Sequence, residues 1–145
     1  MTTSFDELDL KIIRFIEKDV ESSYLELAKE AGVSVSTIYK RVQRLKSKGV
    51  IKKIVAQIDY EKLGFGVHAL ICVSLKPRSR EGALRELMNL GYFHHLYELT
   101  GRYDYMIEVS VKNIAELREI LVEKMSKIDG VLATETFLIT NHIWA

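Results

Sequence analysis

The chain has 145 residues, of which 48% are hydrophobic and 28% charged, and its formal net charge is +1. This composition predicts a folded protein and excludes a disordered one, and the length suffices for one ordinary domain or two small ones. No apolar run reaches the roughly 18 residues of a membrane span, and the start, MTTSFDELDLK, lacks the basic and apolar regions of a secretory signal. We therefore expect a cytoplasmic protein without a membrane partner.

Residues 6–53 are predicted to be helical, with three helices. The stretch DELDLKIIRFIEKD repeats apolar residues with a period near 3.6, and its acidic start suits a helix N-terminus. Ser23 is placed to cap a second, short helix, YLELAKEAG, which Gly32 ends. Ser34 is placed to cap a third helix that runs to about Lys48. Because a short turn with a glycine joins the second and third helices, the pattern predicts a helix-turn-helix.

The third predicted helix separates apolar from basic side chains. At about 100° per residue, one side gathers the apolar residues expected to pack on the other two helices, which are Val35, Ile38, Val42 and Leu45. From Ser34 to Lys53 the chain carries seven basic residues and no acidic one, although it has 21 basic and 20 acidic residues in total. Residues 1–62 hold 12 basic and 10 acidic residues. We expect these acids to lie mainly on the first two helices, away from the basic face of the third.

The outer face of this helix carries small polar side chains near its start and basic ones further on, which is typical of a helix that reads DNA. Its first residues reach base edges in the major groove, and its lysines and arginines neutralise phosphates. A solvated basic face on an ordinary helix is the alternative, and the two preceding helices and the turn favour DNA. A monomer would bind weakly, so we expect at least a dimer on a palindromic operator. The predicted DNA-binding residues are Ser34, Ser36, Thr37, Lys40, Arg41, Gln43, Arg44, Lys48 and Lys52.

The texture of the sequence changes after the third helix. The stretch VIKKIVAQIDYEKLGFG alternates and is rich in β-branched residues before it reaches two glycines. Residues 1–53 are therefore assigned to the helix-turn-helix domain, residues 54–66 to a connecting strand and linker, and residues 67–145 to a second domain.

The second domain is predicted to have the order β-α-β-β-α-β. Its strands are VHALICVSLK, FHHLYELT, YMIEVSV and VLATETFLIT, and its helices are EGALRELMNLG and IAELREILVEKMSKID. This is the ferredoxin-like arrangement, so the chain as a whole is α+β. Leu84, Leu87 and Met88 of the helix EGALRELMNLG are expected to face the interior of the domain. Asn113 with Glu116, at the start of the other helix, resembles a capping box.

A four-stranded sheet that carries two helices leaves one face uncovered. We expect this face to form a dimer interface. The residues expected to supply it are Phe93, His95, Tyr97, Leu99 and alternating residues of Val67–Leu75.

The cysteine and the histidines favour no catalytic or metal site. Cys72 is the only cysteine, which excludes an internal disulfide, and its apolar surroundings predict a buried, inert thiol. The four histidines show no ligand spacing with cysteine or carboxylates, so we expect neither a metal nor a cofactor. The adjacent His94 and His95 are expected to point to opposite faces of a strand.

The two halves together resemble the leucine-responsive/asparagine-regulator (Lrp/AsnC) family of prokaryotic transcription regulators. The resemblance rests on LDLKIIRFIEKD, on ELAKEAGVSVSTIYKRVQRLKSKGVIKK and on TGRYDYMIEV, and it covers about residues 6 to 142. It implies an N-terminal, winged helix-turn-helix domain and a C-terminal regulatory (RAM) domain. It also implies dimers that assemble into tetramers or octamers, and small effectors, commonly amino acids, that bind between regulatory domains.

The resemblance also points to an effector site at a G-x-x-D type turn between the second and third strands of the regulatory domain. Glycine lets a backbone approach a ligand closely, and exposed backbone N–H groups can hold a carboxylate while an aspartate pairs with an ammonium group. A hairpin turn with a local role for its aspartate is the alternative. The predicted effector-binding residues are Thr100, Gly101, Arg102, Tyr103, Asp104, Thr134 and Thr136.

Two other functions stay open. Some relatives of this architecture are enzymes that decarboxylate sirohaem, and the intact basic helix argues against that activity here. A ligand-sensing assembly module that has lost its DNA function is the third hypothesis, and the same helix makes it the weakest.

Overall fold

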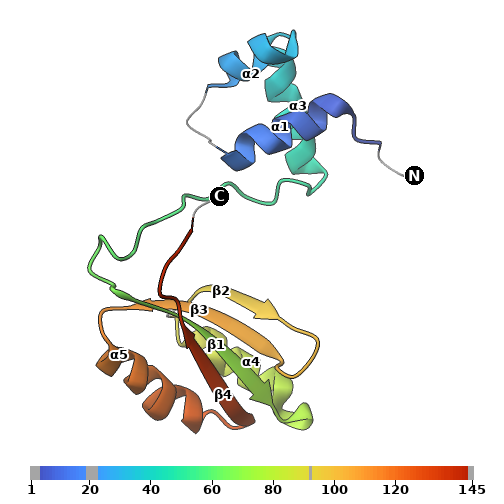
Figure 1. The fold of residues 1–145 in the computed structure, drawn as a ribbon. Helices are drawn as coiled ribbons and strands as arrows, with labels where there is room; N and C mark the ends of the chain where they lie inside the picture. The colour runs from blue at the N-terminus through green and yellow to red at the C-terminus, as the bar shows by residue number, and fades with distance from the viewer. Residues whose placement is uncertain (1–3, 19–22, 92, 144–145) are drawn as a thin grey trace. The chain divides into compact units, whose positions relative to one another are not determined.

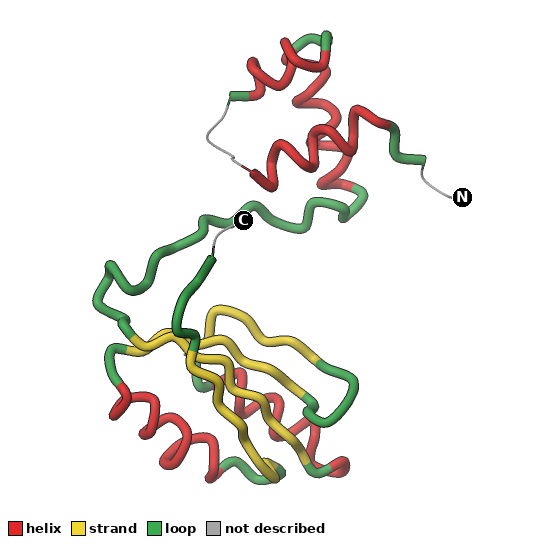
Figure 2. The backbone as a smooth tube through the Cα atoms, in the orientation of Figure 1, coloured by secondary structure: helices red, strands yellow, loops and turns green. Residues whose placement is uncertain are grey.

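The computed structural model describes residues 4–18, 23–91 and 93–143, which belong to two compact units divided between Gln57 and Ile58. The first unit contains α1 (Glu7–Lys18), α2 (Tyr24–Ala31) and α3 (Val35–Ser47) (Figure 1). The second contains a four-stranded sheet with helices (Figure 2). Within the described ranges, no helix is long and apolar enough to cross a membrane.

The caps of the helical unit are those that the sequence predicts. The Ser34 hydroxyl accepts a hydrogen bond from the Thr37 backbone N–H at 3.2 Å and begins α3. Ser23 accepts the backbone N–H of Glu26 in the same way and begins α2. Gly32 ends α2 with a φ of 67°, which costs glycine little. The short α2–α3 turn is therefore fixed at both ends.

The hydrophobic core of the helical unit is small. Its buried side chains are Ile12, Leu27, Ala28, Ile38, Val42 and Leu45. Three of the four apolar residues predicted to face inward from α3 are therefore confirmed. The fourth, Val35, is 41% exposed at the first position of α3, so its predicted inward position was wrong.

The segment after α3 forms no regular element. Residues 52–59 are neither helix nor strand, and residues 60–64 form a turn (Figure 2). A strand needs a neighbour to accept its backbone hydrogen bonds, and the described sheet pairs only the four strands of the second unit. The connecting strand expected within residues 54–66 is thus not formed in the single chain.

The sheet of the second unit is antiparallel throughout. Its strands are β1 (Val67–Leu75), β2 (Phe93–Glu98), β3 (Tyr105–Val111) and β4 (Val131–Leu138), in the order β2-β3-β1-β4. This order, with one helix in each crossover, confirms the predicted ferredoxin-like arrangement.

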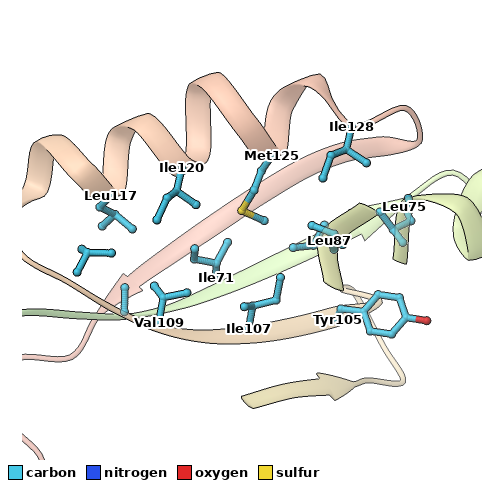
Figure 3. Packing of buried hydrophobic residues seen from close by; sticks show 14 residues of the cluster. Ile71, Leu75, Leu87, Tyr105, Ile107, Val109, Leu117, Ile120, Met125 and Ile128 are labelled. Carbon is cyan, nitrogen blue, oxygen red and sulfur yellow. The ribbon is translucent and has the colours of Figure 1, made fainter. Parts of the chain in front are cut away.

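Both helices of the second unit pack on the same face of the sheet. A short 3-10 turn (Pro77–Ser79) precedes α4 (Arg80–Asn89), while α5 (Ile114–Arg118) continues through a π-helical turn (Glu119–Lys124) and a 3-10 turn (Met125–Lys127). Figure 3 shows Leu117, Ile120 and Met125 directed at Ile71 and Val109 on the strands.

Leu87 and Met88 of α4 were both predicted to face the interior, and the structure buries only one of them. Leu87 of α4 is fully buried, as predicted. Met88 is 61% exposed, so its predicted inward position was wrong. The predicted capping box of α5 is formed only in part. Asn113 Oδ1 accepts the Glu116 backbone N–H at 2.9 Å, but Glu116 Oε2 accepts the backbone N–H of Lys112 rather than that of Asn113.

The opposite face of the sheet carries a mixture of apolar and polar side chains. Strand register places His68, Leu70 and Cys72 of β1 on this face, beside Met106 and Glu108 of β3. His95 and Tyr97 of β2 pair with Glu108 and Met106 and share the face.

A register shift between Phe93 and His95 changes the start of β2. As a result Phe93 packs against the helix-covered core, so its predicted place on the uncovered face was wrong. Leu99 lies past the end of β2 and contributes no paired position to the sheet.

Candidate nucleic-acid interface and effector site

The outer side of α3 presents the short polar and cationic side chains that the sequence singles out. Ser36, Lys40 and Gln43 are exposed on the helix. Lys48, which ends it, and Lys52, which follows, are exposed as well. The hydroxyl of Ser36 near the helix start and the amide of Gln43 further along suit base contacts, and the lysines suit phosphate contacts.

The start of α3 is ordered by a small hydroxyl network. The Ser34 hydroxyl lies 2.8 Å from the Thr37 hydroxyl and 3.0 Å from the Ser36 hydroxyl. All three groups belong to the predicted DNA-binding set. Each hydroxyl can both donate and accept, so this network can rearrange to meet either kind of base edge.

Arg41 and Arg44 of α3 differ from the lysines because they are already paired. Asp9 of α1 is completely buried, and its Oδ1 lies 3.0 Å from Arg41 Nη1 while its Oδ2 lies 2.7 Å from Arg44 Nη2. Asp6 Oδ2 lies 2.6 Å from the same Arg41 nitrogen. The two arginines are therefore tied to the first helix across more than thirty positions of sequence.

These ion pairs correct one expectation from the sequence. The acids of the first helix were expected to lie away from the basic face of α3, and for Asp6 and Asp9 this was wrong. Hydrogen bonds from the Asp9 backbone N–H and from Arg41 hold the pKa of Asp6 below its ordinary value, and the two carboxylates raise the pKa of Arg41. Two of the seven basic charges between Ser34 and Lys53 are thus offset within the unit.

The turn between β2 and β3 is firmly anchored at its ends. The Leu99 N–H donates to the Asp104 carbonyl at 2.8 Å, and the Asp104 N–H donates to the Val73 carbonyl at 2.9 Å. Between these anchors Thr100, Gly101 and Arg102 are exposed. Gly101 has a φ of 132°, a conformation that L side chains rarely adopt.

Asp104 is the centre of a polar cluster at this end of the sheet. Its Oδ2 accepts the Leu75 backbone N–H at 2.7 Å, and its Oδ1 lies 3.2 Å from Arg80 Nη1. The other nitrogen of Arg80, Nη2, lies 2.9 Å from Glu98 Oε1. One guanidinium at the start of α4 thus bridges two carboxylates. Neither Arg80 nor Glu98 was predicted, because no local motif marks them.

The structure brings some of the predicted effector-binding residues together and separates others. Tyr103 donates a hydrogen bond to Glu135 of β4, and the Arg102 guanidinium lies 5.4 Å from the centre of the Tyr103 ring. Thr134 and Thr136 share a face, as expected, but they pair with Val73 and Ile71 of the helix-covered core. Glu135, between them, is the β4 residue that reaches the turn.

A group of ionisable side chains lies around His68, at the start of β1. Glu108 bridges two imidazoles, with Oε1 at 2.9 Å from His68 Nε2 and Oε2 at 2.8 Å from His95 Nδ1. The His94 ring stacks on Tyr60 with 3.9 Å between centroids and lies 6.1 Å from the His68 ring. His94 and His95 therefore both lie close to His68, and the expected separation by the sheet was wrong because the register shift breaks the alternation.

Burial shifts the pKa of two side chains of the second unit, His94 and Cys72. It is the main cause that lowers the pKa of His94, and the neighbouring His68 and His95 lower it further while Glu108 opposes them. Burial, with the charge of Glu135, raises the pKa of the Cys72 thiol and keeps it protonated. No group of three or more histidine, cysteine or acidic side chains in the described residues could hold a metal ion.

Comparisons with known proteins match both units. Residues 5–52 match the winged helix-turn-helix DNA-binding family, and residues 68–144 match the Lrp/AsnC ligand binding domain. The chain belongs to the Lrp/AsnC family of transcriptional regulators. The regulatory protein AsnC of Haemophilus influenzae is 36% identical over 136 residues, which are 93% of this chain and 91% of that protein. The transcriptional regulator FL11 of Pyrococcus horikoshii is 34% identical over 139 residues, covering 96% and 91%.

Solved structures of the family agree with the fold. AsnC of E. coli superposes with a TM-score of 0.85 at 31% identity, covering 98% of this chain and 96% of that one. A Neisseria meningitidis transcriptional regulator, solved as a complex with L-Met, superposes with a TM-score of 0.88 at 19% identity, covering 98% and 94%. The predicted family, the fold and the role as a transcription regulator are thereby confirmed.

Proposed function

We propose that α3 is the DNA-reading helix of this regulator and that its exposed polar and cationic side chains make the contacts. The observation that supports this proposal is that the apolar and the polar side chains of α3 lie on different sides of the helix. Ile38, Val42 and Leu45 are buried, whereas Ser36, Lys40 and Gln43 are exposed. The remaining predicted residues, Ser34, Thr37, Arg41, Arg44, Lys48 and Lys52, flank that exposed strip. Contacts to both phosphates and base edges give sequence-specific binding.

The uncovered face of the sheet is proposed as the surface on which two copies meet. Tyr97 is 45% exposed and Phe137 49% exposed, and apolar side chains of this size are costly to leave in water. A dimer places two copies of α3 on two half-sites, which favours a palindromic operator. Light scattering on the full-length protein should give at least a dimer, and a monomer at micromolar concentration would contradict this.

The turn at residues 99–104 is proposed as one part of a site for a small effector, an amino acid in the first instance. Exposed backbone N–H groups near Gly101 suit a carboxylate, and the acidic side chains of Glu98 and Asp104 suit an ammonium group. The methionine in the Neisseria relative supports this class of ligand. The proposed effector residues are Thr100, Gly101, Arg102, Tyr103 and Asp104. Thr134 and Thr136 of β4 lie on the helix-covered face, so Glu135 between them takes their place in the proposal.

The test of the regulator is a selection from random duplex DNA with the full-length protein, repeated with pooled amino acids. An enriched palindromic motif is expected, with half-sites about one helical turn apart. A changed enrichment with the amino acid pool would support the effector. No enrichment at low salt, with the protein folded, would contradict the proposal.

We further propose that the protein acts as a cytoplasmic regulator and has no catalytic activity of its own. The discriminating measurement is the absorption spectrum after addition of haem or sirohaem. A regulator leaves the spectrum of the added tetrapyrrole unchanged, whereas uptake with a shifted Soret band would favour the decarboxylase-like function.

A further inference from the structure

The ion pairs between α1 and α3 have an unusual construction for a surface helix. Asp9 is 0% exposed, and each of its oxygens is given to a different arginine of α3. Bonds of 2.7 and 3.0 Å between ionised partners are strong and directional. Asp9 thereby fixes where two guanidinium groups of the DNA-reading helix lie.

The two arginines are only partly withdrawn from solvent. The side chain of Arg41 is 27% exposed and that of Arg44 is 39% exposed. A guanidinium has five N–H donors, and the bond to Asp9 occupies only one nitrogen of Arg44. The exposed part of the fork therefore stays accessible to a phosphate or a guanine edge.

Stability alone does not account for this arrangement. Replacing a buried ion pair by apolar residues is often neutral or stabilising, so a helix–helix contact does not require one. Arg44 Nε is also buried with no hydrogen-bond partner, which is unfavourable for the folded unit. A feature that is not optimal for folding, on the helix that reads DNA, points to a role in binding.

The charges provide a second, independent argument. Each lysine or arginine that neutralises a phosphate strengthens binding to any sequence. Asp6 and Asp9 offset the charges of Arg41 and Arg44, while Lys40 keeps an exposed charge on the same helix. The carboxylates thus reduce the attraction of α3 to arbitrary DNA and leave the directional donors in place.

We propose that Asp9 is a positioning residue for operator recognition. It holds Arg41 and Arg44 in one geometry on α3, and it lowers the affinity for non-operator DNA by offsetting their charge. Asp9 thereby raises the ratio of specific to non-specific binding without contacting DNA. This inference rests on the proposed role of α3 as the DNA-reading helix.

The test compares Asp9→Asn with Glu7→Gln in the full-length protein. Glu7 is an exposed acid in the first turn of the same helix, so its substitution removes the same charge without releasing an arginine. Affinities are measured for the selected operator and for a random duplex of equal length, at several salt concentrations. Asp9→Asn is expected to lower the operator-to-random ratio roughly tenfold or more, with affinity for the random duplex unchanged or higher. Glu7→Gln is expected to leave the ratio within about twofold of wild type.

A second variant protects the test against misfolding of Asp9→Asn. Arg44→Lys keeps the charge and the phosphate attraction but loses the planar fork that Asp9 orients. The proposal predicts the same loss of ratio for Arg44→Lys, with an unchanged salt slope. If Asp9→Asn behaves like Glu7→Gln, or if Arg44→Lys keeps the wild-type ratio, the inference is overturned. If the wild-type protein binds no duplex at all, the proposed function fails first, and the role of Asp9 falls with it.

Discussion

The first, helical unit and the second unit, called the regulatory unit below, both contain arginine–carboxylate pairs at their proposed binding sites. The two units differ in how deeply those pairs are buried. In the helical unit the shared carboxylate, Asp9, is fully buried and joins two helices. In the regulatory unit the shared group is Arg80, whose side chain is 40% exposed beside carboxylates that are 67% and 26% exposed.

This difference matters because solvent screens exposed charges and competes for them. The buried carboxylate of Asp9 is screened less by salt, so its contacts with Arg41 and Arg44 depend less on the solution conditions, which suits the proposed role of α3 on DNA. An exposed cluster at a turn can exchange a partner for a ligand at little cost. On the proposed function, the first unit holds its recognition helix in a fixed position, whereas the turn of the second unit can exchange a side-chain partner for a ligand.

The largest expected effect comes from breaking the buried cluster outright. Asp9→Ala removes the carboxylate and leaves Arg41 and Arg44 without their buried partner, which should cost the helical unit about 3 kcal/mol. Hydrogen exchange should show loss of protection in α1 and α3, while the sheet of the second unit keeps its protection. Equal loss in both units would show that they do not unfold separately.

The regulatory unit can be broken without touching any charge. Gly130 has a φ of 99°, and a Cβ there would come within 2.5 Å of Ser79 Cβ, so Gly130→Ala should cost about 2 kcal/mol. Hydrogen exchange should then show loss of protection in the sheet alone. The matched control is Gly82→Ala in α4, where a Cβ meets open space and should stabilise the helix by about 0.5 kcal/mol. Similar results for the two variants would contradict the packing around Gly130.

A smaller effect is expected from the exposed cluster. Asp104→Ala removes the acceptor of the Leu75 N–H and one of the two carboxylate partners of Arg80, which should cost about 1 kcal/mol. Urea unfolding of the regulatory unit measures it, with the exposed Asp129→Ala as the control. A cost as large as that of Asp9→Ala would remove the distinction between the two clusters.

The smallest effect is a pH dependence at His94. Because the folded pKa of His94 lies below its ordinary value of 6.5, the folded unit binds fewer protons than the unfolded chain as the pH falls through that value. Stability that is present above pH 6.5 is therefore lost on acidification. His94→Phe keeps a ring against Tyr60 without a titrating group, so its unfolding temperature should fall less between pH 7 and 5. An unchanged pH dependence would mean that His94 does not contribute.

Local chemistry made much of the architecture predictable. Ser23, Ser34 and Gly32 mark helix ends through contacts within a few residues, and the β-α-β-β-α-β order follows from periodicity and turns. The exposed strip of α3 was likewise predictable from its helical spacing.

The remaining features depend on contacts that local patterns do not encode. The pairing of Asp9 with α3 joins residues 32 and 35 positions apart. The register shift between Phe93 and His95 places Phe93 on the helix-covered face, and neither glycine nor proline stands between these two residues to mark the shift in the sequence. The pairing of β4 with β1 places Thr134 and Thr136 on the helix-covered face, and Glu135, between them, reaches the turn.

The central claim is that α3 binds DNA through its exposed cations, and the salt dependence of binding tests it most directly. Each phosphate contact contributes a slope of about one to the plot of log affinity against log salt. Lys40→Ala should reduce the slope by about one and weaken binding to all sequences. The control, Lys112→Ala, removes an exposed lysine of the regulatory unit and should leave the slope unchanged. Wild-type affinity and slope in Lys40→Ala, on DNA that the protein binds, would show that α3 does not lie on the duplex.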